Sequence, residues 1–528
     1  MIEHDFLVLG GGTNGLVSAG YLSKGGVDVG VIEGRSFFGG GAQTRELSVP
    51  GFFHETDSVA HHMIQTNPLI INDELELKSK YGLDYIQPEI TTAFLFPDET
   101  YWCIYPSLDK TCESIAAISP KDAEAYRKFI DWAGQLTPMF TSSMWSQSPG
   151  FGQLAAMLDS DPGGQELLRA LLGSAALVVN EFFTNEYIKV GLLKLSTEIM
   201  MSPWQDGTGS NLFLLIPSNH HFPMCTPRGG GIELPRSLVR CIEDHGGKIY
   251  LNSDINKILV EGGRAVGVQC ANGETFRARK GILSTLHARQ MFGGESPLID
   301  PSLYPADMGY KVQRLSPSTA SPLTCNYSLK EIPRYKAGGD VDRAFVVQLL
   351  PMMQEFRDHW DDCARGRLPK TPTPYVACHS IYDDSKAPAG MAAVQYYDPE
   401  TYDLVPGGHD RWDQVREQQE DVKLAWWRKF AVNITDENIL GRDMMSPNDL
   451  VRYDKNYMEG DNGGMGAQLY QFYGSRPIPA LGRHRTPIDG LYLGGVTSHP
   501  GSGVSGGGRV PAQIVLEDMG IDFASVIG

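Results

Sequence analysis

The first part of the chain alternates between short apolar runs and glycine turns. An apolar run at residues 6–9 leads directly into glycines, and a helical pattern then covers residues 16–24 until Gly25-Gly26 ends it. A second run, at residues 27–33, begins with valine at every other position. A strand, a helix and a strand within about 30 residues predict a βαβ unit, and the crossover of such a unit joins parallel strands of one sheet.

The rest of the chain has a mixed pattern. Helical patterns cover residues 120–136, 165–180, 187–200, 232–245 and 510–519. Between residues 248 and 281 the pattern instead predicts a β-meander with turns at Gly262-Gly263 and Asn272-Gly273. A last short strand is expected at residues 490–493, directly before a glycine-rich loop.

Composition and charge narrow the function classes. The formal charge is −18 at pH 7, which argues against binding to nucleic acid and against charge-driven docking on anionic lipid. The 8 cysteines are scattered without a C-x-x-C pair, so neither a zinc site nor a dithiol centre is expected. The start of the chain leaves no room for a signal peptide, and the longest apolar stretch, at residues 167–179, is too short to span a bilayer. We therefore expect a cytoplasmic protein without a transmembrane segment.

The glycine turn after the first strand has a specific spacing, Gly10-x-Gly12-x-x-Gly15. In this spacing the first glycine permits a tight turn, the second lets a pyrophosphate approach the backbone, and the third lets helix and strand pack closely. The helix N-terminus adds amide donors and a positive dipole for the phosphates. Glu33 ends the second strand, where a carboxylate accepts hydrogen bonds from an adenosine ribose. We interpret the motif as a dinucleotide site; the alternative is a tight turn and a surface glutamate.

Two further glycine-rich segments favour FAD over NAD. Arg35 and the run at residues 39–44 follow the ribose acid directly, and a second loop of close approach suits a long cofactor. The alternative for this loop is a flexible hairpin. Near the C-terminus, Gly494-Gly495 ends a strand, and the loop up to residue 506 leads into the last helix. Backbone amides at a helix start stabilise negative charge on the pyrimidine edge of a reduced flavin, so we expect FAD as the cofactor.

These motifs, together with Pro227-x-Gly229-Gly230 and the terminal Leu-Tyr-Leu-Gly-Gly…His-Pro-Gly-x-Gly, resemble the phytoene desaturase-related family of FAD-dependent oxidoreductases over essentially the whole chain. Residues 105–111 and 119–123 are similar to its O-type carotenoid ketolase branch. The resemblance implies an amine-oxidase-type fold, non-covalently bound FAD and removal of hydride from a C–H bond. Family members desaturate, isomerise or oxygenate mostly lipophilic molecules, usually without a bound nicotinamide.

The expected fold class is α/β, with a Rossmann-type FAD-binding domain and an inserted mixed α+β substrate domain. At 528 residues the chain exceeds what one hydrophobic core usually supports. Cofactor-type sequence occurs in three separate places, so residues 1–70, 225–290 and 485–528 are predicted to form a discontinuous FAD-binding domain. Residues 71–224 and 291–484 are predicted to form the substrate-binding domain.

By resemblance, the cofactor contacts fall on residues that match the family motifs. The expected set is Gly10, Gly12, Thr13, Asn14, Gly15, Glu33, Gly34, Arg35, Gly40, Gly41, Ala42, Ile255, Gly495, Pro500, Gly501, Gly503 and Val504. The last five of these are expected near the isoalloxazine, and Ile255 or its strand neighbours near the adenine. Family members often carry an acidic residue beside the second glycine of the terminal strand. This chain has Gly494-Gly495 there, so we expect no side-chain contact to the ribityl phosphate at that point.

Four histidines and one aspartate are the candidate catalytic residues: His54, Asp57, His61, His221 and His499. A base near the flavin takes a proton as hydride leaves, and histidine or a buried acid suits that role. Each histidine has the alternative of a hydrogen-bonded structural role. The two His-His pairs of the chain lack a third ligand at metal-binding spacing, so no metal is expected.

The predicted function is an FAD-dependent oxidoreductase that removes hydride from a largely apolar or cyclic small molecule, as a desaturase, dehydrogenase or oxidase. Oxygen or a quinone is the expected electron acceptor, no nucleic-acid partner is expected, and the sequence leaves a homo-oligomer open. Two alternatives also stay open. One is a flavin-dependent double-bond isomerase, and the other is a non-catalytic flavin-binding interaction protein.

Overall fold

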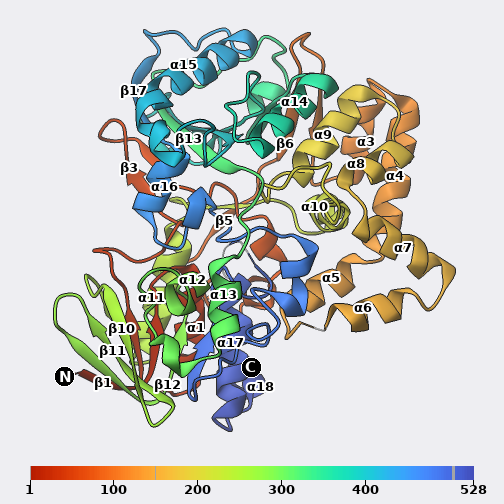
Figure 1. Cartoon of the computed structure of the whole chain (residues 1–528). Helices are drawn as coiled ribbons and strands as arrows, with labels where there is room; N and C mark the ends of the chain where they lie inside the picture. The colour runs from red at the N-terminus through yellow and green to blue at the C-terminus, as the bar shows by residue number, and fades with distance from the viewer. Residues whose placement is uncertain (1, 149, 502, 504–505) are drawn as a thin grey trace.

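Two seven-stranded sheets organise the chain. The computed structural model describes residues 2–148, 150–501, 503 and 506–528. In Figure 1 the first sheet lies low in the view and the second lies above it, while a group of helices from α3 to α10 fills the right-hand side. The molecule is therefore built from two layered bodies with a helical lobe beside them.

The first sheet combines a parallel part with an antiparallel edge. Its order is β10 (Ile255–Glu261), β11 (Arg264–Cys270), β12 (Thr275–Ser284), β1 (Ile2–Leu9), β2 (Val29–Ile32) and β9 (Lys248–Tyr250), and β18 (Leu491–Leu493) also pairs with β12. Strands β9, β2, β1, β12 and β18 run parallel, whereas β10, β11 and β12 form an antiparallel meander. The predicted βαβ unit is confirmed. The predicted meander is wrong at its start, because helix α11 (Glu233–Asp244) precedes β9 and returns the chain to the parallel edge beside β2.

Side chains of β1 alternate between two hydrophobic cores, as the two-residue period of a strand requires. Phe6 and Val8 pack under helices α1 (Thr13–Lys24), α11, α17 (Gly506–Asp518) and α18 (Phe523–Ile527). Leu7 and Leu9 pack on the opposite face, under α12 (Ala288–Phe292) and α13 (Ala306–Gln313). The sheet is thus covered on both faces, which parallel strands require.

The second sheet carries the larger cores. Its order is β17 (Ile439–Met445), β13 (Ser321–Leu329), β16 (Ala392–Glu400), β15 (Tyr375–Cys378), β14 (Val346–Leu349), β6 (Thr92–Leu95) and β7 (Tyr101–Ile104). One face packs against helix α15 (Trp412–Phe430), which contributes Trp412 and Trp427. The other face packs against the helical lobe and contains a cluster of buried aromatic side chains.

The helical lobe contains α3 (Leu108–Ala116), α4 (Pro120–Gly134), α5 (Thr137–Met144), α6 (Phe151–Leu158), α7 (Pro162–Leu172), α8 (Ala175–Phe182), α9 (Glu186–Ser196) and α10 (Gly209–His221). The single helix predicted at residues 165–180 is wrong, since two helices cover it. Helix α7 ends before Gly173, and Ser174 begins α8 by accepting a hydrogen bond from the backbone N–H of Leu177 at 3.1 Å. A glycine followed by a capping serine therefore marks a break that the apolar pattern hid.

The remaining elements connect these bodies. They are α2 (Pro68–Ile71), α14 (Met353–Ala364), α16 (Pro447–Tyr453), and two short hairpins, β3 (Thr44–Glu46) with β4 (Phe53–Glu55) and β5 (Tyr85–Ile86) with β8 (Thr226–Pro227). Hairpin β3–β4 continues the second glycine turn, and β8 leads into the Pro227-x-Gly229-Gly230 motif. Both hairpins thus lie in the segments that join the first sheet to the rest of the chain.

A buried ion pair joins these connections to the second sheet. Glu55, at the end of β4, pairs with Lys386, and both side chains are 1% exposed. The same carboxylate accepts hydrogen bonds from the Thr44 hydroxyl at 2.9 Å and from the backbone N–H of Gly231 at 3.0 Å. Burial raises the pKa of Glu55. Lys386, His379 and the hydrogen bond from Thr44 together outweigh burial, so the pKa lies below its usual value. Glu55 is therefore a charged link between three segments that are distant in sequence.

The contacts around Glu55 and Lys386, which we call the junction, explain the glycines of the Pro227-x-Gly229-Gly230 motif. Gly230 has a φ of +101°, and a Cβ there would collide with Lys386, Thr44 and Glu55. The backbone N–H of Gly229 donates to Asp383 at 2.7 Å. The motif therefore serves the contact between the two bodies, because only glycine leaves room for the ion pair.

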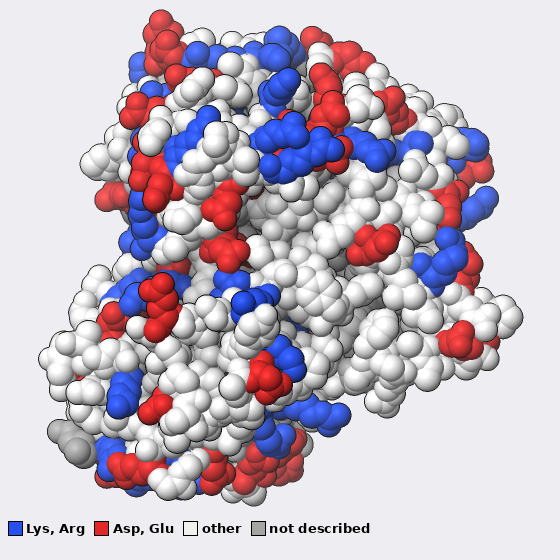
Figure 2. All heavy atoms as spheres, in the orientation of Figure 1, with Lys and Arg blue, Asp and Glu red and all other residues white. Residues whose placement is uncertain are grey.

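The surface is charged in a scattered way. On the face shown in Figure 2, Lys and Arg lie interleaved with Asp and Glu over most of the outline, and charged side chains are sparse over α5 and α6. Within the described residues no helix is long and apolar enough to cross a membrane. The net negative charge is therefore not gathered into one patch on this face.

We predict that Lys386→Met strongly destabilises the protein, because it leaves the Glu55 carboxylate buried without a counter-ion. Breaking such a pair costs about 3–5 kcal/mol, measurable as a lower midpoint of denaturant unfolding. Lys311→Met is the matched control, since Lys311 pairs with Asp307 at 3.0 Å on the surface and should contribute less than about 1 kcal/mol. Adding Glu55→Gln to Lys386→Met should recover part of the loss. Equal midpoints for the two lysine variants would show that the junction does not depend on this pair.

Candidate active site

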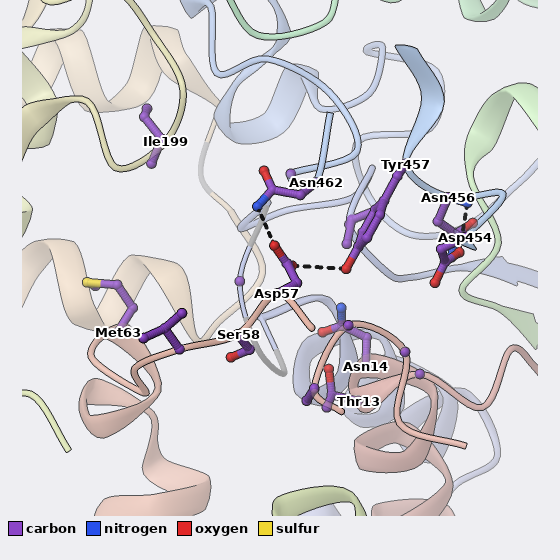
Figure 3. Close-up of a pocket in the computed structure, with 18 of the residues that line it drawn as sticks. Thr13, Asn14, Asp57, Ser58, Met63, Ile199, Asp454, Asn456, Tyr457 and Asn462 are labelled. Atoms are coloured by element: carbon purple, nitrogen blue, oxygen red, sulfur yellow. Dashed lines mark hydrogen bonds between the residues drawn. The ribbon is translucent and has the colours of Figure 1, made fainter. Parts of the chain in front are cut away.

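A cavity of about 580 Å³ lies where the loops of the first sheet meet the second sheet. Its lining includes the glycine loop after β1, the glycine turn at residues 40–42 and the inner face of the second sheet. In Figure 3, Asp57 lies between Thr13 on one side and Ile199 on the other. We call the part around the first glycine loop the nucleotide end, and the part against the second sheet the distal end.

The three glycines of the first loop are needed for different reasons. Gly10 has a φ of +96°, and a Cβ there would lie 2.7 Å from the hydroxyl oxygen of Thr285. A Cβ on Gly15 would collide with the carbonyl of Gly10. Gly12 is different, because its φ of −68° suits any residue and its Cβ would have only the Cα of Gly40 nearby, at 3.7 Å. The protein itself leaves the space beside Gly12 open to the cavity, as close approach of a pyrophosphate requires.

Glu33 and Arg35 form the edge of the nucleotide end. The buried Glu33 carboxylate accepts hydrogen bonds from the backbone N–H of Gly11 at 2.7 Å and of Arg35 at 2.9 Å. The Arg35 guanidinium pairs with Asp454 at 3.2 Å and lies over the ring of Tyr453. Glu33 Oε1 also accepts from Nε of Arg35 at 3.3 Å, whereas Oε2 accepts one hydrogen bond and retains a lone pair for a ribose hydroxyl.

Asp57 lies at the middle of the cavity beside the second glycine turn. Tyr457 donates its hydroxyl to the carboxylate at 3.0 Å, and the side-chain amide of Asn462 donates at 2.8 Å, as the dashed lines of Figure 3 show. A Cβ on Gly41 would collide with the Tyr457 hydroxyl. Burial raises the pKa of Asp57 to about 6, against the two hydrogen bonds, which lower it. Asp57 therefore changes charge close to neutral pH.

One segment of the nucleotide end could not be predicted from the sequence. Residues 452–457, at the end of α16 and after it, line the cavity opposite the glycine loop. Lys455 pairs with Asp254 at 2.8 Å, and Asn456 accepts from the backbone N–H of His287 at 2.8 Å. These contacts hold the segment over the first sheet. Neither spacing nor glycine content marks it, so the sequence carried no signal for it.

The terminal glycine loop contributes less to the lining than predicted. Gly503 lines the cavity, whereas Gly495, Pro500 and Gly501 do not. A Cβ on Gly495 would lie 2.6 Å from the carbonyl of Thr285, and one on Gly501 would lie 3.1 Å from the guanidinium of buried Arg476. Packing alone thus accounts for these two glycines. Val504 lies outside the described residues.

Most of the predicted cofactor residues are brought together. Those that line the cavity are Gly10, Gly12, Thr13, Asn14, Glu33, Gly34, Arg35, Gly40, Gly41, Ala42, Ile255 and Gly503. Gly15 does not line it and instead packs against Gly10. The side chain of Asn14 also accepts a hydrogen bond from the backbone N–H of Gly507 at 2.9 Å, which joins α1 to the start of α17. Direct contact of each residue with a cofactor stays a prediction.

The catalytic candidates are separated by the structure. Asp57 and His61 line the cavity, whereas His54, His221 and His499 do not. His54 is bonded to Ser48 at 3.0 Å, and His499 is bonded to the backbone carbonyl of Ser143 at 2.7 Å. His221 is exposed at the end of α10. His54 and His499 thus have the hydrogen-bonded positions that were the alternative for each histidine.

The histidines in and near the cavity are neutral. Burial lowers the pKa of His61 to about 4, and its ring is bonded to the Tyr85 hydroxyl at 3.0 Å. The neighbouring His62, which was not predicted as a site residue, also lines the cavity, and burial lowers its pKa to about 4. No group of three metal-binding side chains occurs in the described part of the chain. Of the cavity-lining candidates, Asp57 is the one that titrates near neutral pH.

A match to a protein-family model identifies the family of this chain. The model described as flavin containing amine oxidoreductase matches residues 15–329, more than half of the chain. The chain belongs to this family. It is therefore an FAD-dependent oxidoreductase, and the expected cofactor is confirmed as FAD.

Curated relatives confirm the expected phytoene desaturase-related branch. Pyridine nucleotide-disulfide oxidoreductase domain-containing protein 2 of Rattus norvegicus is 27% identical over 98% of this chain and 94% of its own length. A component of the limonene dehydrogenase of Castellaniella defragrans is 26% identical over 98% of this chain and 95% of its own. A 4,4'-diapophytoene desaturase of Methylomonas sp. is 22% identical over 98% and 96%.

Solved structures confirm the fold. Cyclohexylamine oxidase of Brevibacterium oxydans aligns with a TM-score of 0.60 at 13% identity, covering 98% of this chain and 99% of that one. At this identity the likeness concerns the fold alone. The predicted Rossmann-type, amine-oxidase-like α/β fold is thus confirmed.

We predict that Gly12→Val gives a folded protein that binds FAD at least about tenfold more weakly, because the side chain fills the space left for the pyrophosphate. Flavin absorption after purification and the rise in melting temperature on adding FAD measure this loss. Gly15→Ala is the matched variant, and its collision with Gly10 should instead reduce the yield of folded protein. A folded Gly12→Val protein with a full complement of FAD would contradict the assignment.

Proposed function

We propose that the protein removes hydride from a C–H bond of a small molecule that lies in the distal end of the cavity. One observation carries the proposal. The cavity is continuous from the dinucleotide-type glycine loop to the face of the second sheet, so it can hold a cofactor and a substrate side by side. Bound FAD supplies the two-electron acceptor.

The chain's own residues divide the task of holding the cofactor. We propose that the backbone at Gly12 and the N-terminus of α1 bind the pyrophosphate, and that Glu33 binds the adenosine ribose. The turn at residues 40–42 and Gly503 supply close backbone approach further along the cavity. We also propose that residues 1–70, 225–290 and 485–528 act as the FAD-binding domain. Residues 71–224 and 291–484 then act as the substrate domain, with residues 452–457 reaching across to the cofactor.

Asp57 is our proposed proton acceptor. It lies between the glycine turn and the distal end, and its carboxylate is held in place by Tyr457 and Asn462. A base of this kind accepts the proton that leaves the atom next to the carbon from which hydride is removed. His61 lines the same space, but its low pKa and its bond to Tyr85 favour an orienting role.

The lining of the distal end supports a substrate with a lipophilic or cyclic body. Apolar side chains there include Val59, Met63, Ile64, Leu195, Ile199, Leu215, Met224 and Val346. Two relatives are named for dehydrogenation or desaturation of molecules of that kind, limonene and 4,4'-diapophytoene. We propose oxygen or a quinone as the electron acceptor.

Mixing the purified holoenzyme anaerobically with cyclic terpenes and short polyenes, without NAD(P)H, tests the reaction class. We expect the flavin absorption to bleach and the product to lack two hydrogens by mass spectrometry. Bleaching that reverses with a product of unchanged mass would instead indicate a double-bond isomerase. A flavin that no member of the panel reduces would favour a flavin-binding interaction protein.

We predict that Asp57→Asn slows flavin reduction by about 10²–10⁴-fold, the usual contribution of a positioned base. In the unsubstituted protein the rate should rise with pH through about 6, because the carboxylate form is populated above that pH. The asparagine variant should lose this rise. The pKa of Asp57 is raised in the folded state, so its ionised form destabilises the fold above pH 6. The Asp57→Asn variant should therefore be at least as stable as the unsubstituted protein above that pH.

Tyr457→Phe provides the matched variant for the pH profile. Loss of the hydrogen bond to the carboxylate should raise the pKa of Asp57 further, and the rate should then rise at a higher pH. A profile that stays unchanged in both variants would exclude Asp57 as the proton acceptor. Lower stability of Asp57→Asn at pH 8 would indicate a structural role instead.

A further inference from the structure

The two ends of the cavity differ in whether cationic side chains line them. Its lysine and arginine residues are Arg35, Arg452 and Lys455, all near the nucleotide end. From Asp57 at the middle of the cavity to Glu198 at the distal end, the described lining contains these carboxyls and neither a lysine nor an arginine. The histidines His61 and His62 add no charge there, because burial holds the pKa of each at about 4. The distal end is therefore acidic or neutral, but not cationic.

Glu198 faces this space with few partners of its own. It follows the end of α9, its side chain is exposed where it lines the cavity, and no cation of the described chain lies within salt-bridge distance. Its one hydrogen bond comes from the side-chain amide of Gln348, at 3.5 Å. That is too long to satisfy a carboxyl group with two oxygens. Glu198 therefore has free acceptor capacity.

The sheet opposite Glu198 is built as a polar wall. Gln348, Tyr375 and Tyr397 are directly cross-strand neighbours on β14, β15 and β16. The two tyrosine rings are stacked, with centroids 4.7 Å apart and planes at 12°. Gln348 is 2% exposed, and its amide oxygen has no hydrogen-bond partner among the described residues. The Lys194 ammonium, four residues before Glu198, acts on the carboxyl through space and without a salt bridge. An amide oxygen without a donor beside a carboxyl without a salt-bridge partner is costly in a bare hydrocarbon environment.

These groups restrict what binds at the distal end. A hydrocarbon would cover the Glu198 carboxyl without offering it a hydrogen bond, which loses the free energy of its hydration. A carboxylate or phosphate would meet Asp57 and Glu198 as like charges, with no cation in the described lining of this end to compensate. A hydroxyl or amine group would donate to Glu198, while the apolar side chains around it bury the rest of the molecule.

We propose that the substrate has an apolar body and a hydroxyl or amine group that donates a hydrogen bond to Glu198, and that it carries no negative charge. This rests on the proposed function, because it takes the distal end as the substrate site. It narrows the substrate from lipophilic molecules in general to those with a donor group. Glu198 is then a specificity-determining residue, and Asp57 acts at the cofactor side of the same molecule.

Four probes with one carbon skeleton test the proposal: limonene, perillyl alcohol, perillylamine and perillic acid. Titration of the holoenzyme by calorimetry should give about 10- to 100-fold tighter binding of the alcohol or the amine than of the hydrocarbon and the acid. Equal affinities for the four probes, no binding of any probe, or tightest binding of the hydrocarbon or the acid would overturn the proposal.

Variants at Glu198 assign the preference to this side chain. Glu198→Leu should abolish the advantage of the donor probes and improve binding of limonene. Glu198→Gln keeps the shape and one acceptor oxygen, so the affinity for perillyl alcohol should stay within a few-fold of that of the unsubstituted protein. The affinity for perillylamine should fall further if its ammonium form is the preferred donor, because the variant lacks the negative charge. Glu113→Gln, an exposed carboxyl on α3 outside the cavity lining, is the matched control and should leave all four affinities unchanged. An unaltered preference in Glu198→Leu would overturn the assignment.

Flavin bleaching by the same probes separates the two proposals. Donor-dependent binding without any reduction of the flavin would keep the role of Glu198 and reject the oxidation. Reduction by limonene as efficient as by the alcohol or the amine would keep the oxidation and reject the donor preference. Flavin absorption and melting temperature of each variant confirm that the holoenzyme is folded.

Discussion

The buried carboxylate of Glu55 is the interaction on which the arrangement of the two sheets depends. A charge removed from water is tolerated only when its partners surround it. Here the partners come from hairpin β3–β4, from the turn before α11 and from Lys386 near the second sheet. The backbone carbonyl of Glu55 also accepts from Gln395 of β16, at 2.9 Å. A displacement of either sheet would break several of these contacts at once, so the junction fixes the width of the cavity.

The same segment also delivers the group at the centre of the site. Asp57 follows Glu55 by two residues, yet the pKa values of the two acids move in opposite directions. Glu55 is buried and Asp57 is half-buried, and removal from water alone raises the pKa of each. Glu55 has Lys386 against it and stays ionised, whereas Asp57 has only the neutral donors Tyr457 and Asn462. One short stretch thus supplies a permanent charge that holds the fold and a titratable group that faces the cavity.

Local rules made part of the site predictable from sequence. The spacing of Gly10, Gly12 and Gly15 and the position of Glu33 follow from the geometry of one βαβ unit, so residues within 35 positions of each other were enough. Residues 452–457 and Glu198 could not be found in this way. They reach the cavity through long-range packing of α16 and α9, and nothing in their own sequence reports that packing.

Glycine content was informative about backbone constraint but not about its cause. Gly12 is open on the side that faces the cavity, whereas Gly495 and Gly501 are required by Thr285 and Arg476. The sequence does not distinguish these two causes, and of the glycines predicted in the terminal loop Gly503 is the one that lines the cavity. Histidine had a similar ambiguity. Burial keeps most of the candidate histidines neutral and hydrogen-bonded to neighbouring residues. Only the structure shows which imidazole lines the cavity and which lies in the core.

The placement of cationic side chains along the cavity bears on the choice of substrate. At the nucleotide end each cation is matched by a carboxylate, since Arg35 pairs with Glu33 and Asp454, and Lys455 pairs with Asp254. From Asp57 to the distal end, the described lining has two carboxyls and no lysine or arginine as a counter-ion. Partial burial raises the pKa of Asp57, while Glu198, which is exposed to the cavity, keeps free acceptor capacity. A neutral or cationic donor stabilises either group, whereas an anion meets their ionised forms as like charges. The lack of a lysine or arginine beside Asp57 and Glu198 in the described lining is therefore what disfavours an anionic substrate.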